Sequence, residues 1–159
     1  MKKQKGFSLI ELLIVVAIIL IIAAIAIPNL LKSKMAANES SAVGTIRTLN
    51  TAQVTYAASC PAIGYSATLS ELNTGALCAG GINIVDNVIG KDPAVKSGYS
   101  TAYLPGAAAG GVVNTYTLVA TPLSPGVTGQ RQFCSDQTGV IRYEVSGAGC
   151  AAPGSPALQ

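Results

Sequence analysis

The chain has 159 residues, carries no histidine, and is only 11% charged. This length suits one domain plus an additional segment, and the lack of histidine excludes hydrolases that use a histidine-based triad. The formal charge of +3 comes from Lys2, Lys3 and Lys5, because the charged side chains that follow them balance. Since no later stretch is a basic cluster, we expect no dedicated nucleic-acid site.

An apolar helix is expected over residues 7–31, after a basic leader at residues 1–6. From Leu12 to Ile27 every side chain is apolar. As a helix, residues 7–31 would extend about 37 Å, enough to cross a bilayer core of about 30 Å. In lipid the segment must be helical, because its backbone groups find no water to bind. The lysines before it predict a cytoplasmic N-terminus.

One carboxylate, Glu11, lies at the start of this apolar run. An ionisable group in a membrane-length helix is costly and marks a functional residue. A simple uncleaved anchor accounts for the lysines and the apolar run, but not for Glu11. A cleaved secretory signal peptide is disfavoured because the apolar core is long, and because Pro28-Asn29 follows it without small residues at a cleavage site.

Pro28 is expected to bend or locally open the helix near residues 25–31, because proline removes one intrahelical hydrogen bond. The alternative is that the helix ends there. Residues 32–59 nevertheless predict an amphipathic continuation of the helix, which Cys60-Pro61 would end. A three-to-four-residue spacing identifies its inward-facing side chains as Val43, Ile46, Leu49 and Tyr56.

Residues 60–159 predict a globular head, so the fold class is α+β: a long N-terminal helix packed against a small antiparallel sheet. Residues 60–96 form a long connection with a short helical turn at 70–72. The strand candidates are residues 98–103, 112–121, 130–134 and 140–145, the last two joined as a hairpin by residues 135–139. The tail from residue 146 is expected to be irregular and frayed beyond Cys150.

Four cysteines, Cys60, Cys78, Cys134 and Cys150, all lie beyond the apolar run. An even number of cysteines in a small domain outside the membrane predicts two disulfides. Zinc is the competing interpretation, but the chain has neither histidine nor a CxxC pair. Of the three pairings we favour the two local ones, Cys60–Cys78 and Cys134–Cys150, and each would contribute about 3 kcal/mol by closing its loop.

No arrangement of residues in the sequence predicts catalysis. The acids are dispersed, and no phosphate-binding glycine loop is present. A calcium site at Asp86 and Asp92 is conceivable, but their spacing is unlike that of an EF-hand. We therefore predict that the chain is not an enzyme, and that it has no catalytic residue, no cofactor and no metal site.

The stretch Gly6-Phe7-Ser8-Leu9-Ile10-Glu11 resembles the processing motif of type IV pilins and pseudopilins. That motif has a basic leader ending in glycine, an aromatic first mature residue, a glutamate at the fifth mature position, and then an apolar helix. Gly6, Phe7 and Glu11 match it residue by residue, and the close resemblance covers residues 1–56. The resemblance implies cleavage by prepilin peptidase between Gly6 and Phe7, and N-methylation of Phe7.

The resemblance further implies a pilin that is held in the bacterial inner membrane before assembly. It would then self-assemble into an extracellular helical filament, which is a homo-oligomer. Prepilin peptidase and the pilus assembly machinery would be its partners, and motility, adhesion or DNA uptake its roles. Phe7 and Glu11 are one helical turn apart. We expect Glu11 of one subunit to meet the Phe7 amine of the next, while Pro28 permits bending. A major pseudopilin of type II secretion is the alternative, and the loop that Cys134–Cys150 would close favours the pilin.

Overall fold

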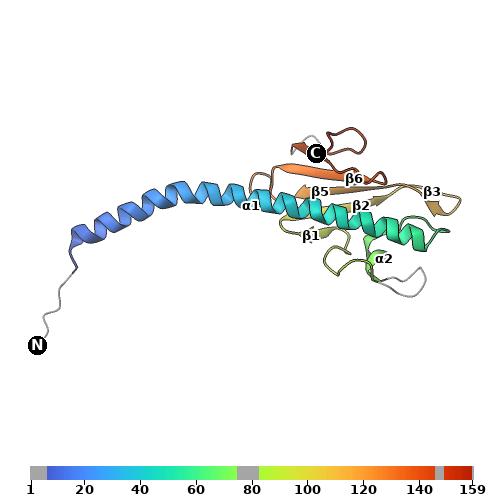
Figure 1. Ribbon diagram of the computed structural model, residues 1–159, viewed down its shortest axis with the longest axis horizontal. Helices are drawn as coiled ribbons and strands as arrows, with labels where there is room; N and C mark the ends of the chain where they lie inside the picture. The colour runs from blue at the N-terminus through green and yellow to red at the C-terminus, as the bar shows by residue number, and fades with distance from the viewer. Residues whose placement is uncertain (1–6, 75–82, 146–148, 159) are drawn as a thin grey trace, which may run out of the picture. The chain divides into compact units, whose positions relative to one another are not determined.

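The computed structural model describes residues 7–74, 83–145 and 149–158. The chain divides into two compact units, residues 1–34 and residues 35–159, and each is described by itself. The first unit is helical from Leu9 onward. The second unit holds the rest of that helix, a short second helix and all the strands (Figure 1).

The longest element is α1, Leu9–Ser59. Pro28 lies inside it, and the helical assignment continues without a break on both sides, so the helix does not end at this proline. The local opening expected near residues 25–31 is likewise not present. The side-chain amide of Asn29, the residue after the proline, donates a hydrogen bond to the Ile25 carbonyl one turn earlier at 3.1 Å.

The inward-facing residues predicted for α1 are confirmed. In the second unit α1 buries Val43, Ile46, Leu49 and Tyr56, and these side chains belong to the single hydrophobic core formed with the sheet. Ile46 and Leu49 are completely buried. The opposite face of the helix is solvent-exposed, as expected for an amphipathic helix that covers one face of a sheet. The helix ends at Ser59, immediately before Cys60-Pro61, also as predicted.

A short helix, α2 (Leu69–Thr74), occupies the position where a helical turn was predicted. It buries Leu69 and Leu72 in the core. The Glu71 carboxylate accepts a hydrogen bond from the Ala67 backbone N–H at 2.8 Å, which caps the start of this helix. Elsewhere between residues 60 and 93, the described residues form no helix or strand.

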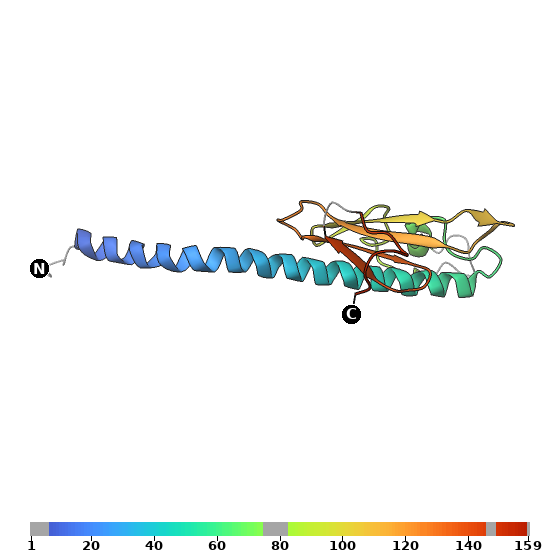
Figure 2. The same ribbon diagram turned by 90° about the horizontal axis from the view of Figure 1, so that it is seen from above.

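The head contains a five-stranded antiparallel sheet in the order β1-β2-β5-β6-β7. Its strands are β1 (Ala94–Lys96), β2 (Tyr99–Pro105), β5 (Tyr116–Pro122), β6 (Arg131–Asp136) and β7 (Arg142–Val145). Figure 2 shows the sheet and α1 as two layers of the head. Tyr99, Tyr103, Tyr116 and Phe133 fill the space between these layers, as part of the core.

The stretch 112–121, predicted as one strand, is two strands. β4 (Val112–Val113) pairs with β3 (Ala108–Ala109) as a separate hairpin, and β5 begins only at Tyr116. The hydrogen bonds of Val113 account for this division. Its N–H donates to the Ile63 carbonyl and its carbonyl accepts the Tyr65 N–H, so neither group pairs with the main sheet. The short strands β1 and β3 were not predicted, since two or three residues show no periodicity.

The expectation of a frayed tail beyond Cys150 is wrong. The Leu158 N–H donates to the Ile141 carbonyl at 2.8 Å, and the Tyr143 N–H donates to the Pro156 carbonyl at 3.0 Å. Leu158 also packs against the hydrophobic core. The end of the chain therefore pairs with β7 and supplies the backbone partners that this edge strand would otherwise lack.

Candidate functional site

The start of α1 is built around a contact between Ser8 and Glu11. The Ser8 backbone N–H donates a hydrogen bond to Glu11 Oε2 at 2.9 Å. Ser8 directly precedes the helix, and a glutamate three residues later that reaches back to its N–H is one half of a capping box. The spacing Ser-x-x-Glu in the sequence carries this signal, but no role was predicted for Ser8.

Glu11 thus has a partner within its own chain. The hydrogen bond goes to Ser8 rather than to Phe7, which is 78% exposed. In this position the carboxylate also lies in the first turn of α1, where the helix macrodipole favours an anion. The predicted pairing of Glu11 with the amine of Phe7 concerns two subunits, and it stays a prediction. Gly6, the other residue of the predicted cleavage site, lies outside the described residues.

The apolar part of α1 exposes nearly all its large side chains. Leu9, Ile21 and Leu30 are 75%, 63% and 70% exposed, and no residue between 7 and 34 is buried. By length and composition α1 can cross a membrane. A surface of this kind is far larger than the apolar patches that soluble monomers expose, so it marks contact with lipid or with other proteins.

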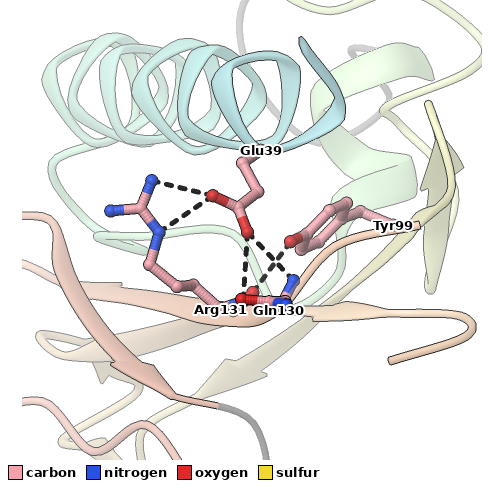
Figure 3. A network of polar contacts seen from close by, with 4 residues as sticks. All are labelled: Glu39, Tyr99, Gln130 and Arg131. Carbon is pink, nitrogen blue, oxygen red and sulfur yellow. Dashed lines mark hydrogen bonds and ion pairs between the residues drawn. The ribbon is translucent and has the colours of Figure 1, made fainter. Parts of the chain in front are cut away.

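A polar network attaches α1 to the sheet at Glu39 (Figure 3). Its Oε1 accepts the backbone N–H groups of Gln130 and Arg131 at 2.9 and 3.2 Å. Its Oε2 accepts Arg131 Nε at 2.9 Å and pairs with Nη2 at 2.8 Å. Tyr99 completes the network by donating its hydroxyl to the Arg131 carbonyl at 2.8 Å. These bonds fix the start of β6 against one turn of the helix.

Burial and hydrogen bonding act in opposite directions on Glu39. Burial alone would raise its pKa, but the hydrogen bonds from Gln130 and Arg131, together with the guanidinium charge, outweigh that effect and hold the pKa below its ordinary value. For Tyr99, burial and the nearby Glu39 charge raise the pKa to about 12. The network therefore holds an ionised carboxylate and a neutral phenol at neutral pH. No motif in the sequence singled out Glu39 for this role.

The cysteines of the head are oxidised where the structure describes them. Cys134 in β6 forms a disulfide with Cys150, the local pairing that was predicted. Cys60 is also disulfide-bonded. Its predicted partner, Cys78, lies outside the described residues, so the pairing Cys60–Cys78 stays a prediction.

The two aspartates considered for calcium have structural partners. Asp86 Oδ1 accepts the backbone N–H groups of Val88 and Ile89 at 2.8 and 2.9 Å. Asp92 Oδ1 accepts the Tyr103 N–H at 3.4 Å. Within the described ranges, no three His, Cys, Asp or Glu side chains are grouped so that they could hold a metal ion.

Comparison with known proteins finds similarity in the N-terminal segment of the chain. Residues 1–27 match the family model of the prokaryotic N-terminal methylation motif. Over 54 residues the chain is 50% identical to the type IV major pilin protein PilA of Myxococcus xanthus, covering 34% of this chain and 24% of that protein. These findings show that the N-terminal part of the chain is similar to that of type IV pilins.

Two further pilus proteins are similar over comparable lengths. The type IV wide pilus major component PilA4 of Thermus thermophilus is 60% identical over 40 residues, 25% of this chain and 30% of that protein. A fimbrial protein of Pseudomonas aeruginosa is 54% identical over 52 residues, 33% and 34% of the two chains. The similarity thus spans about a quarter to a third of the curated relatives, and no solved structure matches the chain.

Proposed function

We propose that this pilin is a structural subunit that self-assembles into a type IV pilus on the bacterial surface. The observation that carries the proposal is the apolar segment of α1, which exposes large side chains on every face and begins with the methylation motif. Such a helix needs one apolar environment before assembly and another after it. The inner membrane supplies the first, and the helices of other subunits supply the second.

Processing makes the transfer between these environments feasible. Cleavage after Gly6 removes Lys2, Lys3 and Lys5, which tie the N-terminus to the cytoplasmic face, and it leaves a methylated amine on Phe7. Prepilin peptidase and the pilus assembly machinery are the proposed partners. Motility, adhesion or DNA uptake is the role we assign to the filament, and self-assembly rather than catalysis is its activity.

Glu11 is proposed to set the axial stagger between subunits. In the single chain its Oε2 accepts the Ser8 N–H, and among the described residues no donor binds its Oε1, which can accept a second donor. The Phe7 amine of a neighbouring subunit is a cationic donor of the right kind. In an apolar filament core, a subunit in the wrong register would leave a charge buried without its partner, which is strongly unfavourable.

The variant Glu11→Gln tests this role because glutamine keeps an oxygen for the Ser8 N–H and removes the charge. We expect the variant to be processed and to remain in the membrane, while sheared filaments become scarce by electron microscopy. Glu144→Gln, a change of the same kind on β7, is the control and should assemble normally. Mass spectrometry of the subunit should find an N-methylated Phe7 at its start.

Two results would argue against the proposal. Normal filaments from Glu11→Gln would show that the charge does not set the stagger. A subunit absent from long surface filaments, whose deletion blocks protein secretion instead, would identify a pseudopilin of type II secretion.

A further inference from the structure

The head contains a pocket between α1 and the turn that joins β6 to β7. Its volume of about 480 Å³ lies within the range of about 300–1,000 Å³ that is usual for small-molecule sites. All its lining residues belong to the second unit, so its shape does not depend on the first. We call it the turn pocket, and it is lined by Arg47, Asn50, Thr51, Val54, Tyr116 and the turn at residues 137–139.

The wall formed by α1 carries an arginine that is available to a ligand. Arg47 precedes Asn50, Thr51 and Val54 by three, four and seven positions, which places these side chains on one face of the helix. Arg47 is exposed, and among the described residues no carboxylate pairs with its guanidinium. A guanidinium presents its N–H donors in a planar fork that fits a carboxylate through parallel hydrogen bonds. The turn pocket therefore offers one positive charge to an anion.

Asn50 contributes a buried amide to the same pocket. It is only 8% exposed, its Nδ2 donates to Ser135 Oγ at 2.8 Å, and its Oδ1 accepts the Tyr116 hydroxyl at 3.0 Å. A side-chain amide has a second N–H group and further lone-pair capacity on its oxygen. Within the described part of the chain no other partner binds them, so a donor and an acceptor of fixed orientation remain for a ligand.

Hydrogen bonds within the turn preform the opposite wall. The Gly139 N–H donates to the Asp136 carbonyl at 2.9 Å, and the Thr138 N–H donates to Asp136 Oδ1 at 2.9 Å. Ser135 Oγ donates to the Val140 carbonyl at 3.1 Å. The Asp136 carboxylate is thus bound inside the turn, and none of the described residues that line the pocket is acidic. The pocket is therefore positive as well as preformed.

The lining distinguishes between classes of anion. A nucleic-acid strand needs a row of cations along its phosphates and aromatic rings on which its bases stack. The turn pocket has one cation, and Tyr116 is only 2% exposed, so its ring is not a stacking surface. Amides and hydroxyls that both donate and accept suit the hydroxyl groups of a sugar. Val54 is 57% exposed and offers apolar surface to the C–H groups of a sugar ring.

We propose that the turn pocket binds an acidic sugar, that is, a sugar unit that carries a carboxylate. The Arg47 guanidinium binds the carboxylate, the amides of Asn50 and Gln137 bind ring hydroxyls, and Val54 contacts the ring. Binding requires only the folded head. Its use in adhesion to acidic polysaccharides rests on the surface location given under the proposed function.

An NMR titration of the full-length, isotope-labelled chain in detergent micelles tests the proposal. The probes are glucuronate, glucose and acetate, and the signals are the Gly139 N–H and the Asn50 side-chain amide. We expect glucuronate to shift both signals saturably. Glucose lacks the carboxylate and should bind at least about tenfold more weakly, because a hydrogen bond to a charged group contributes at least that factor. Acetate lacks the ring and should also bind about tenfold more weakly or less.

Three variants identify the side chains that bind the sugar. Arg47→Gln should weaken glucuronate binding by about tenfold or more, with no effect on glucose. Lys91→Gln removes an exposed cation elsewhere in the head and is the matched control, which should bind as the wild type does. Val54→Glu places a negative charge in the wall of the pocket and should also weaken glucuronate binding. The Leu118 N–H signal, inside the sheet, reports that each variant is folded.

Several outcomes would overturn the proposal. They are unmoved signals with glucuronate, equal binding of glucuronate and glucose, and equal binding by the wild type and Arg47→Gln. Acetate that binds as tightly as glucuronate would overturn the assignment to a sugar. Shifts at Gly139 that grow with the concentration of the chain, without any sugar, would assign the pocket to a carboxylate of a second copy instead.

The titration is independent of filament assembly. Failure of glucuronate to bind would leave the proposed assembly of the pilus standing. Conversely, normal filaments from Glu11→Gln would contradict the proposed stagger and leave the turn pocket standing. The two proposals therefore fail separately.

Discussion

The carboxylate of Glu39 meets the guanidinium of Arg131 through two contacts, at 2.9 Å to Nε and 2.8 Å to Nη2. The same guanidinium lies 5.3 Å from the ring centre of Phe133 and 5.5 Å from that of Tyr143. Arg131 therefore connects one turn of α1 to two adjacent strands of the sheet. Apolar packing holds the helix on the sheet but permits sliding, whereas this directional pair allows one register.

Glu39→Gln should destabilise the head by about 1–2 kcal/mol. Glutamine keeps the size of the side chain, but it cannot form the ion pair and places an amide group against the donors of Arg131. The loss stays moderate because the Arg131 side chain is 39% exposed and regains water. Urea unfolding of the full chain in detergent, monitored through the tyrosine signal, measures this loss of stability. Glu144→Gln is the control, and equal stability of the two variants would contradict the role given to Glu39.

The same pair predicts how stability depends on pH. The folded-state pKa of Glu39 lies below its ordinary value of 4.5. Stabilisation from its ionised form is then fully present above about pH 4.5 and is lost as the pH falls through the lower, folded-state pKa. The free energy of unfolding should therefore drop on acidification below about pH 4.5.

Glu39→Gln should flatten this pH dependence without abolishing it. Asp86 also has a lowered pKa, because the N–H groups of Ile89 and Val88 bind its carboxylate, and it titrates in the same direction. Unfolding curves collected at several acidic pH values for the wild type and the variant make the comparison. Parallel curves for the two proteins would mean that Glu39 is not the group responsible.

Much of this architecture follows from local patterns. Neighbouring residues alone predicted α1. The signals were the apolar run, the spacing of Ile46 and Leu49, and Cys60-Pro61, which ends the helix. The contact between Ser8 and Glu11 is also local, since a capping box needs only four residues.

The remaining features depend on residues far apart in sequence. Glu39 and Arg131 are separated by 92 positions, and nothing near Glu39 distinguishes it from a solvated helix residue. The division at residues 114–115 likewise follows from the bonds of Val113 to the chain around Ile63. The ordered tail depends on Leu158 reaching Ile141, in a segment whose composition indicates disorder.

Gln53→Leu should cost the head about 2–3 kcal/mol, because it leaves a buried donor and acceptor without partners. Gln53 is completely buried, its amide donates to Ser66 Oγ at 2.7 Å, and its carbonyl accepts the Ser66 N–H at 3.0 Å. Thr51→Val, at an exposed position of the same helix, is the control and should change stability by less than about 0.5 kcal/mol. Equal unfolding midpoints for the two variants would show that Ser66 finds other partners.

The disulfide between Cys134 and Cys150 should stabilise both the fold and the ordered tail. The cysteines are 16 residues apart, and closing a loop of that size contributes about 3 kcal/mol in the chain-entropy model. The double variant Cys134→Ala/Cys150→Ala should therefore unfold at a lower urea concentration. It should also lose protection from hydrogen exchange at the N–H groups of Tyr143 and Leu158, which bind the opposing backbone at 3.0 and 2.8 Å.

The amide protons in the centre of the sheet serve as the internal reference for this variant. Leu118 pairs with Ser135 inside the sheet, and its protection should fall only as far as global stability does. A selective loss at Tyr143 and Leu158 would mean that the disulfide holds the tail on β7. A uniform loss at all three residues would mean that it acts through the unfolded chain alone, and that the tail stays paired without it.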